Sequence, residues 1–212
     1  MKYFVPVCLF FILVLTSCPS DSSGSSILPT KTIRWEDDRN GYTQFYTNDT
    51  QYYEMSFWMY FSATNITDVY HVECRKISGS HYYGYGLIMR SSSEEKFYRI
   101  EIASDGSYRY SKFDETKPEG SRFSTIRTWE ESSHINKGNN KLNRIRAVKD
   151  NGYAGPGVKY SVYLNNQKVD DFIDDSEPIT TARIGFSVTV GDEEYESFPN
   201  TPVDVRFKRI TP

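Results

Sequence analysis

The sequence predicts an all-β protein, a two-sheet antiparallel jelly-roll sandwich. Three observations lead to this prediction. From about residue 32 onward, no apolar pattern with a helical period continues beyond two turns. Short stretches rich in Tyr, Phe, Val, Ile and Thr recur throughout this region and are broken by Gly, Asn, Asp and Pro. The stretches form meanders with one long connection, an order that suits a two-sheet jelly roll.

The N-terminal segment predicts export. A positive charge near the start precedes an almost wholly apolar run over residues 3–15, and two small residues follow. This order is typical of a secretory signal peptide, and the run is shorter than the ~20 residues of a membrane-spanning helix. Residues 15–18 (LTSC) resemble the bacterial lipobox, in which the cysteine is acylated. We therefore expect a signal peptide over residues 1–17 and lipidation of Cys18. The alternative is an ordinary signal peptide with a cysteine at its cleavage site.

The region after Cys18 predicts a tether and one domain. Residues 19–31 are rich in Ser, Pro and Gly, and such a segment has little to bury. We expect residues 18–31, the lipidated cysteine and a flexible tether, to hold the domain of residues 32–212 at a membrane of the cell envelope. That length suits a single domain.

The charges are well mixed along the chain. There are 25 basic and 28 acidic residues, and the formal net charge is −3. No basic stripe is visible, so the sequence gives no argument for binding nucleic acid or an anionic lipid surface. We expect no nucleic-acid partner.

The cysteines predict a domain without disulfides. Of the three in the chain, Cys8 leaves with the signal peptide and Cys18 is acylated. Cys74 then has no partner, and its place in a predicted strand favours a small, buried side chain.

Alternation of side chains defines the predicted strands. Residues 53–61 (YEMSFWMYF) place large apolar residues on one face and Glu, Ser, Trp and Tyr on the other. Residues 97–103 alternate in the same way, and we expect Tyr98, Ile100 and Ile102 to face the core. The predicted strands in chain order are 53–61, 68–75, 84–90, 97–103, 107–113, 142–149, 158–164, 168–173, 183–190 and 203–210.

Two turn signals connect these strands into hairpins. Asp105-Gly106 is a strong two-residue hairpin signal, and Asn165 and Asn166 tolerate the left-handed backbone angles that such a turn requires. Residues 114–141 predict a long crossover with one short strand, near residues 125–129.

Several stretches resemble one known pattern. They are residues 85–90 (YGLIMR), 97–102 (FYRIEI), 105–109 (DGSYR), 135–138 (INKG), 143–147 (NRIRA), 163–166 (YLNN) and 183–186 (RIGF), with Trp129 and Asp174. In this order they are similar to bacterial concanavalin A-like (laminin-G-like) jelly-roll domains, such as the accessory domains of exo-inulinase-type enzymes. The sequence departs from the pattern at Asn166 and Ala182, where Gly is usual. The resemblance covers roughly residues 52–210 and implies a concanavalin A-like fold with Trp129 in its core.

The residues that could carry catalysis form no recognisable constellation. Glycoside hydrolases on related jelly rolls place alternating acidic residues on one strand face, whereas the acidic residues 170–175 cover a strand end and a turn. There is no G-x-S-x-G elbow, and His71, His81 and His134 have no spacing typical of a triad or a metal site. We expect a protein that is not an enzyme.

Calcium is the one metal that the resemblance suggests. Laminin-G-like domains often hold Ca²⁺ with Asp and Asn oxygens from loops at one rim, and oxygen is the ligand that Ca²⁺ prefers. The candidate ligands are Asp68, Asp150 and Asp174, although no single loop holds a complete ligand set. No other cofactor is expected.

The aromatic residues are more numerous than one core needs. Sugar rings stack on Trp and Tyr, so an outward sheet face that carries these residues would bind a glycan. The candidate ligand-binding residues are Trp58, Tyr60, Tyr108 and Tyr110. The alternative is that these aromatics form cross-strand pairs that only stabilise the sheets.

Together these features favour a non-catalytic binding module on the bacterial cell envelope. Its ligand would be a glycan or an envelope or host protein. Two other functions stay open at this point. One is a structural envelope protein that packs against a partner through an exposed sheet face. The other is a sugar-acting hydrolase whose carboxylates meet only in the folded chain.

Overall fold

A computed structural model describes residues 32–38, 40–48, 55–61, 68–91, 95–191 and 202–210. Lys31–Pro212 forms one compact unit. The predicted signal peptide and Cys18 lie outside the described residues. In the described part of the chain, no helix is both long enough and apolar enough to span a membrane.

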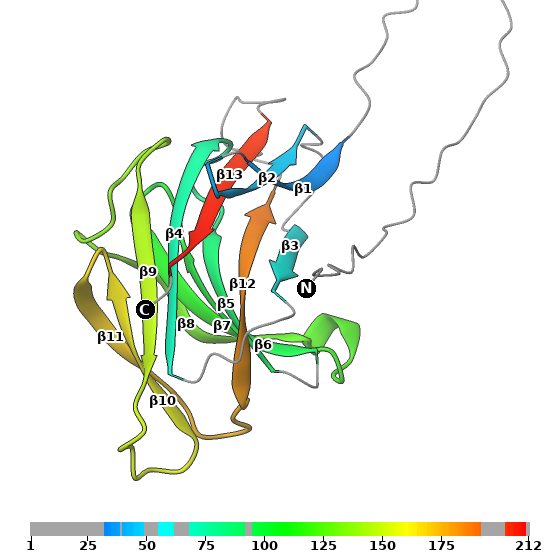
Figure 1. The fold of residues 1–212 in the computed structure, drawn as a ribbon. Coiled ribbons are helices and arrows are strands. Elements are labelled where there is room, and N and C mark those ends of the chain that lie inside the picture. Colours follow the sequence, from blue (N-terminus) through cyan, green and yellow to red (C-terminus); the bar gives the residue numbers. More distant parts are fainter. Residues whose placement is uncertain are drawn as a thin grey trace, which may run out of the picture. The chain divides into compact units, whose positions relative to one another are not determined.

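The strands form two antiparallel sheets that pack face to face, which confirms the predicted jelly-roll sandwich (Figure 1). In spatial order, the seven-stranded sheet consists of β1 (Ile33–Asp37), β2 (Thr43–Thr47), β13 (Val203–Arg209), β4 (Val69–Ser78), β9 (Asn143–Lys149), β10 (Val158–Leu164) and β11 (Gln167–Asp174). The six-stranded sheet consists of β3 (Met55–Tyr60), β12 (Thr181–Val190), β5 (Tyr85–Ser91), β6 (Lys96–Ile102), β7 (Ser107–Asp114) and β8 (Phe123–Glu131).

The core lies between the two sheets, as period-two burial predicts. Tyr98, Ile100 and Ile102 of β6 are fully buried in it, which confirms their expected orientation. Phe186 of β12 stacks on Phe207 of β13 with ring centroids 4.8 Å apart, so an aromatic pair joins the sheets directly. Cys74 is fully buried in the same core, as expected.

Both predicted hairpin turns are present. Gly106 has a φ of 100° between β6 and β7. Asn165 and Asn166 have φ values of 48° and 70° between β10 and β11, and positive φ at both positions is the geometry of a type I′ turn. Ala182 lies where the register of β12 against β5 shifts between Thr181 and Arg183. The sheet thus accommodates this departure from the family pattern as a local irregularity rather than as a turn.

Two regions differ from the predicted element order. The sequence did not predict β1 and β2, and β8 is nine residues long where only a short strand was expected. β1 and β8 are edge strands with mostly exposed side chains. An edge strand that buries little shows no clear apolar alternation, which is why these two were hard to recognise.

Candidate functional site

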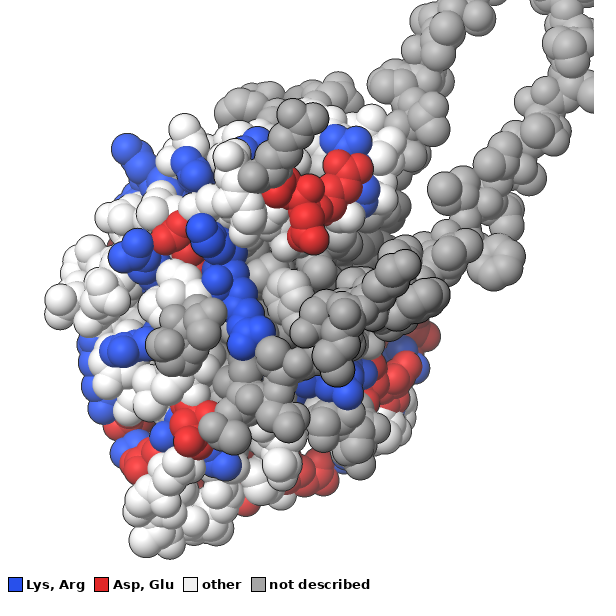
Figure 2. All heavy atoms as spheres, in the orientation of Figure 1, with Lys and Arg blue, Asp and Glu red and all other residues white. Residues whose placement is uncertain are grey.

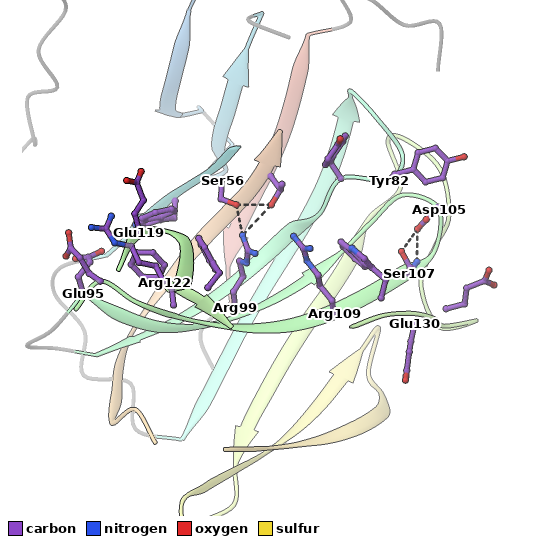
Figure 3. Close-up of a pocket in the computed structure, with 18 residues that line it drawn as sticks. Ser56, Tyr82, Glu95, Arg99, Asp105, Ser107, Arg109, Glu119, Arg122 and Glu130 are labelled. Atoms are coloured by element: carbon purple, nitrogen blue, oxygen red, sulfur yellow. Dashed lines mark hydrogen bonds between the residues drawn. The ribbon is translucent and has the colours of Figure 1, made fainter. Parts of the chain in front are cut away.

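A groove of about 990 Å³ lies on the outer face of the six-stranded sheet, opposite the core. We call it the outer groove. Figure 3 shows its floor on β6 and β7, with Glu95, Glu119 and Arg122 at one end and Tyr82 and Glu130 at the other. From Ser107 to Phe113, β7 runs along the groove for about 20 Å, since a strand rises ~3.4 Å per residue.

Two arginines rise from the floor of the outer groove. Because alternate residues of β6 point into the core, Arg99 and Glu101 point outward, and Arg109 of the neighbouring β7 joins them. Figure 3 shows Arg99 and Arg109 side by side, both directed into the groove. The floor is therefore polar and positively charged at its centre.

Glu101 fixes these arginines from below. Its side chain is fully buried, and its carboxylate accepts hydrogen bonds from Arg109 Nε at 2.8 Å and from Thr189 Oγ1 at 2.8 Å. Arg99 Nε lies 3.2 Å from the same carboxylate. Burial opposes ionisation of Glu101, but the charges of Arg99 and Arg109 and the hydrogen bonds outweigh it, so the pKa of Glu101 lies below its ordinary value. The carboxylate is charged at neutral pH and holds both guanidinium groups in place.

Small hydroxyl residues complete the support of Arg99. Its Nη1 donates to Ser56 Oγ at 2.7 Å, and its Nε donates to Ser111 Oγ at 3.0 Å. The guanidinium also lies 4.6 Å from the ring centroid of Phe123, a favourable cation–π distance. The side chain is thus preorganised before any ligand arrives.

One end of the outer groove is lined by a cluster of aromatic rings. Trp58 of β3 lies 5.2 Å from Phe113 of β7, and Phe113 lies 4.8 Å from Phe123 of β8, measured between ring centroids. Phe123 is 39% exposed, so part of this cluster faces the groove.

The other end is lined by Trp129 with Tyr82 and Tyr83. The guanidinium of Arg109 lies 4.6 Å over the ring of Trp129. Gly84 leaves room for this arrangement, because a Cβ there would lie 3.0 Å from the Trp129 ring and 2.9 Å from Glu101. This end therefore combines aromatic rings, of which Tyr82 is 55% exposed, with a fixed cation.

A buried lysine orients the loop that carries Tyr82 and Tyr83. Lys76 is 1% exposed, and its Nζ donates to the carbonyl oxygens of Ser80 at 2.5 Å and of Tyr83 at 2.6 Å. Three donors on one ammonium group can hold several carbonyls of a turn together.

Carboxylates surround both ends of the outer groove. They are Glu95, Glu115 and Glu119 at one end and Asp105 and Glu131 at the other, whereas the Glu130 side chain points away from the groove and accepts from Tyr108 and Arg127. A positive floor between acidic ends, with aromatic rings at each end, can stack ring faces and hydrogen-bond hydroxyl groups along an extended ligand.

The structure separates the four predicted ligand-binding aromatics. Trp58 lines the outer groove. Tyr60 lies on the same outer face and is 37% exposed, but it is not among the residues that line the groove. Tyr108 and Tyr110 are 5% and 1% exposed and belong to the core, so their assignment to a binding face was wrong. The reason is that alternate residues of β7 face opposite sides of the sheet, and Tyr108 and Tyr110 lie on the side that faces the core.

Trp129 was also placed wrongly, because it was expected in the core and lines the outer groove instead. Sequence reasoning missed Arg99, Glu101 and Arg109 as site residues. A signal for the first two was present: they occupy the polar face of a strand whose other face is wholly apolar. Charged residues on an interior strand of a sheet are a reason to look for a site there.

The three candidate calcium ligands do not form a metal site. Asp174 Oδ2 accepts hydrogen bonds from Lys112 Nζ and Tyr98 OH, each at 2.7 Å, so a lysine already neutralises it. Asp68 accepts from Asn151, and Asp150 pairs with Lys159. Among the described residues, no three His, Cys, Asp or Glu side chains are placed to hold a metal ion together.

Comparison with known proteins settles the fold. The sequence matches no protein-family model and no curated protein. The structure is similar to that of the carbohydrate-binding module CBM66 from Bacillus subtilis, with a TM-score of 0.55 and 16% identity over 84% of this chain and 91% of that one. The fold is a concanavalin A-like jelly roll. It is also similar to an endo-β-1,4-glucuronan lyase from the fungus Trichoderma reesei, with a TM-score of 0.50 and 8% identity over 85% of each chain.

Proposed function

We propose that this protein is a lipoprotein of the bacterial cell envelope whose β-sandwich binds a glycan in the outer groove without catalysing a reaction. The observation that carries this proposal is the preorganised pair Arg99 and Arg109 between two aromatic ends. Sugar rings offer apolar faces to aromatic rings and hydroxyl groups to charged donors. The length of the floor suits several sugar rings in a row. The similarity to a carbohydrate-binding module supports this reading, although one fold hosts many functions.

The state of Glu101 rules this residue out as the general acid of a hydrolase. A general acid needs a raised pKa and access to the substrate. Glu101 has a lowered pKa and no exposed surface, and arginine and threonine donors occupy its oxygens. It therefore acts as a support for the arginines and not as a proton donor.

A glycan array followed by calorimetry with the bound glycan tests the groove. We expect Trp129→Ala to weaken binding about 30-fold, since truncating an aromatic hot spot costs ~2 kcal/mol or more. Tyr46→Ala is the matched control, because Tyr46 lies on β2 in the other sheet. Binding of no glycan, or equal binding by both variants, would contradict the proposed role of the groove.

Metabolic labelling with palmitate tests the anchor separately. The wild-type chain should incorporate label and sediment with membranes, whereas Cys18→Ser should do neither. Label that persists in Cys18→Ser would refute lipidation at this residue.

A further inference from the structure

The outer face of the seven-stranded sheet carries a cluster of cations. Its members, which we call the basic face, are Arg75 of β4, Arg144 and Arg146 of β9, and Arg206 and Lys208 of β13. These three strands are neighbours in the sheet, and residues two apart on a strand share a face. Figure 2 shows Lys and Arg side chains gathered on the face of the molecule that lies over these strands.

The strand register explains why the sequence did not reveal this cluster. Arg206 lies opposite Arg75, and Glu73 lies between Lys208 on one side and Arg144 on the other. Segments more than 120 residues apart in the chain thus form one patch. The sequence shows no basic stripe because charge read along the chain does not reveal which strands lie side by side.

Few acidic groups neutralise the basic face. Glu73 lies within it and binds Arg144, with Nε and Nη2 both 3.1 Å from its carboxylate. Asp38 and Asp204 lie at one edge, each 3.9 Å from Arg206. Five cations therefore face three carboxylates, in a protein whose net charge is −3.

Three members of the basic face, Arg75, Arg146 and Lys208, have no ion pair among the described residues, whereas Arg144 and Arg206 do. Arg146 stacks on Tyr163, with the guanidinium 4.1 Å from the ring centroid, and Lys208 lies 5.5 Å over Tyr42. His71 lies beside Arg146 in the register, and burial together with Arg146 and Arg144 lowers the pKa of His71, so it is neutral at pH 7. The tyrosine rings support the cations without neutralising them, which leaves their charge available to a partner.

We propose that the basic face binds a membrane surface that contains anionic phospholipids. The cations spread in two dimensions over three strands, as a flat surface requires, rather than along a groove that would fit one polymer chain. Each Lys or Arg near such a surface strengthens binding, and screening limits the effect to about 10 Å at moderate salt. The outer groove is on the opposite sheet, so this orientation would leave it facing away from the lipid.

The start of the domain fits the same orientation. The chain enters through β1, at the edge of the sheet that bears the basic face. Only residues 19–32 separate Cys18 from β1, so an anchor at Cys18 would keep the start of the domain within about 50 Å of the lipid. This added proximity rests on the proposed function. Contact between the basic face and the lipid does not, because the cations alone provide it.

Vesicle sedimentation with residues 31–212 tests the proposal without the anchor, because this segment forms a compact unit with its own core. It should bind phosphatidylglycerol vesicles and not phosphatidylcholine vesicles, and the binding should weaken as salt rises. Arg146→Gln with Lys208→Gln should weaken binding about 25-fold, at about fivefold per removed cation. Lys117→Gln with Lys137→Gln is the matched control, since both lysines lie outside the basic face and pair with acids.

Several results would overturn the proposal. One is that the domain binds phosphatidylcholine vesicles as well as it binds phosphatidylglycerol vesicles. Another is that the control pair of substitutions weakens binding as much as the pair in the basic face. A third is that the domain binds soluble dextran sulfate but not vesicles. Lys208→Gln alone keeps the test valid if the double variant folds poorly, because Lys208 is exposed. Trp129→Ala should still bind anionic vesicles, so failure of the groove and failure of the basic face are distinguishable.

Discussion

At the scale of single residues, Glu101 determines both the shape of the outer groove and part of the stability. It is a fully buried carboxylate whose charge is matched by Arg99 and Arg109. Removing one partner of a buried ion pair leaves the other charge uncompensated, which is costly. A substitution in the floor of the site is therefore expected to lower the free energy of unfolding as well.

Glu101→Gln should lower the free energy of unfolding by about 3 kcal/mol at pH 7, because Arg99 stays buried without its counter-charge. Urea unfolding followed by circular dichroism measures this change. Glu119→Gln is the control, since Glu119 is exposed. A loss as large in the control as in Glu101→Gln would contradict the assigned role.

The same carboxylate predicts how stability depends on pH. The folded-state pKa of Glu101 is lowered, so its contribution is complete above the ordinary value of about 4.3 and is lost as pH falls through the folded-state pKa. The wild-type free energy of unfolding should therefore fall below about pH 4, and it should fall less steeply in Glu101→Gln. Parallel curves for the two proteins would contradict this reading.

At the scale of elements, the β10–β11 hairpin separates two roles of neighbouring asparagines. The Asn165 side chain accepts from Arg144 N at 2.8 Å and donates to the carbonyl oxygen of His134 at 2.7 Å. Asn166 is exposed and has a positive φ. Asn165 thus fastens the hairpin to its surroundings, whereas Asn166 only has to adopt the turn.

Asn166→Gly should therefore be neutral or raise the free energy of unfolding by up to about 1 kcal/mol, since Gly adopts a positive φ without steric cost. Asn165→Gly should lower it by about 2 kcal/mol, because it removes the side-chain hydrogen bonds. Thermal unfolding of both variants measures the difference. The opposite order of stability would show that backbone strain, and not side-chain bonding, dominates this turn.

The elements that the sequence predicted well share one property. The strand over residues 97–103 is recognisable from its alternation of apolar and polar residues. The turn at Asp105-Gly106 is recognisable from residue types that favour a tight turn. Both signals lie within a few consecutive residues. β1 and β8 lack such a signal, because they are strands through pairing with a neighbouring strand and not through burial of their own side chains. Their partners β2 and β7 are close in the sequence, but pairing alone leaves no alternation of apolar and polar residues in an edge strand.

At the scale of the whole molecule, a buried polar link joins the two sheets. Asp174 at the end of β11 meets Lys112 of β7 and Tyr98 of β6, each at 2.7 Å. Tyr98 OH also accepts from Ile179 N at 2.7 Å. This group connects the layers through directional bonds that the surrounding aromatic core cannot provide.

Asp174→Asn should lower the free energy of unfolding by about 3–5 kcal/mol, because it leaves the Lys112 ammonium buried without a counter-charge. The double variant Asp174→Asn with Lys112→Met should recover part of that loss. A double-mutant cycle by urea unfolding measures the coupling. Simple additivity of the two single changes would contradict a buried ion pair between the sheets.

The outer groove and the basic face were beyond sequence reasoning for a related reason. Alternation shows that a strand has two faces, but it does not say which strands lie side by side. Tyr108 was assigned to the outer face and Trp129 to the core, and each occupies the opposite side, because the partners of a strand decide which of its alternate residues face the core. A site assembled from five strands becomes visible only when their order is known.

The buried thiol of Cys74 offers a way to measure how often the domain opens. It is the one cysteine after residue 31, it is fully buried, and burial raises its pKa, so alkylating reagents cannot react with it while the layers stay closed. The rate of its modification therefore reports how often the sandwich opens, without any added label.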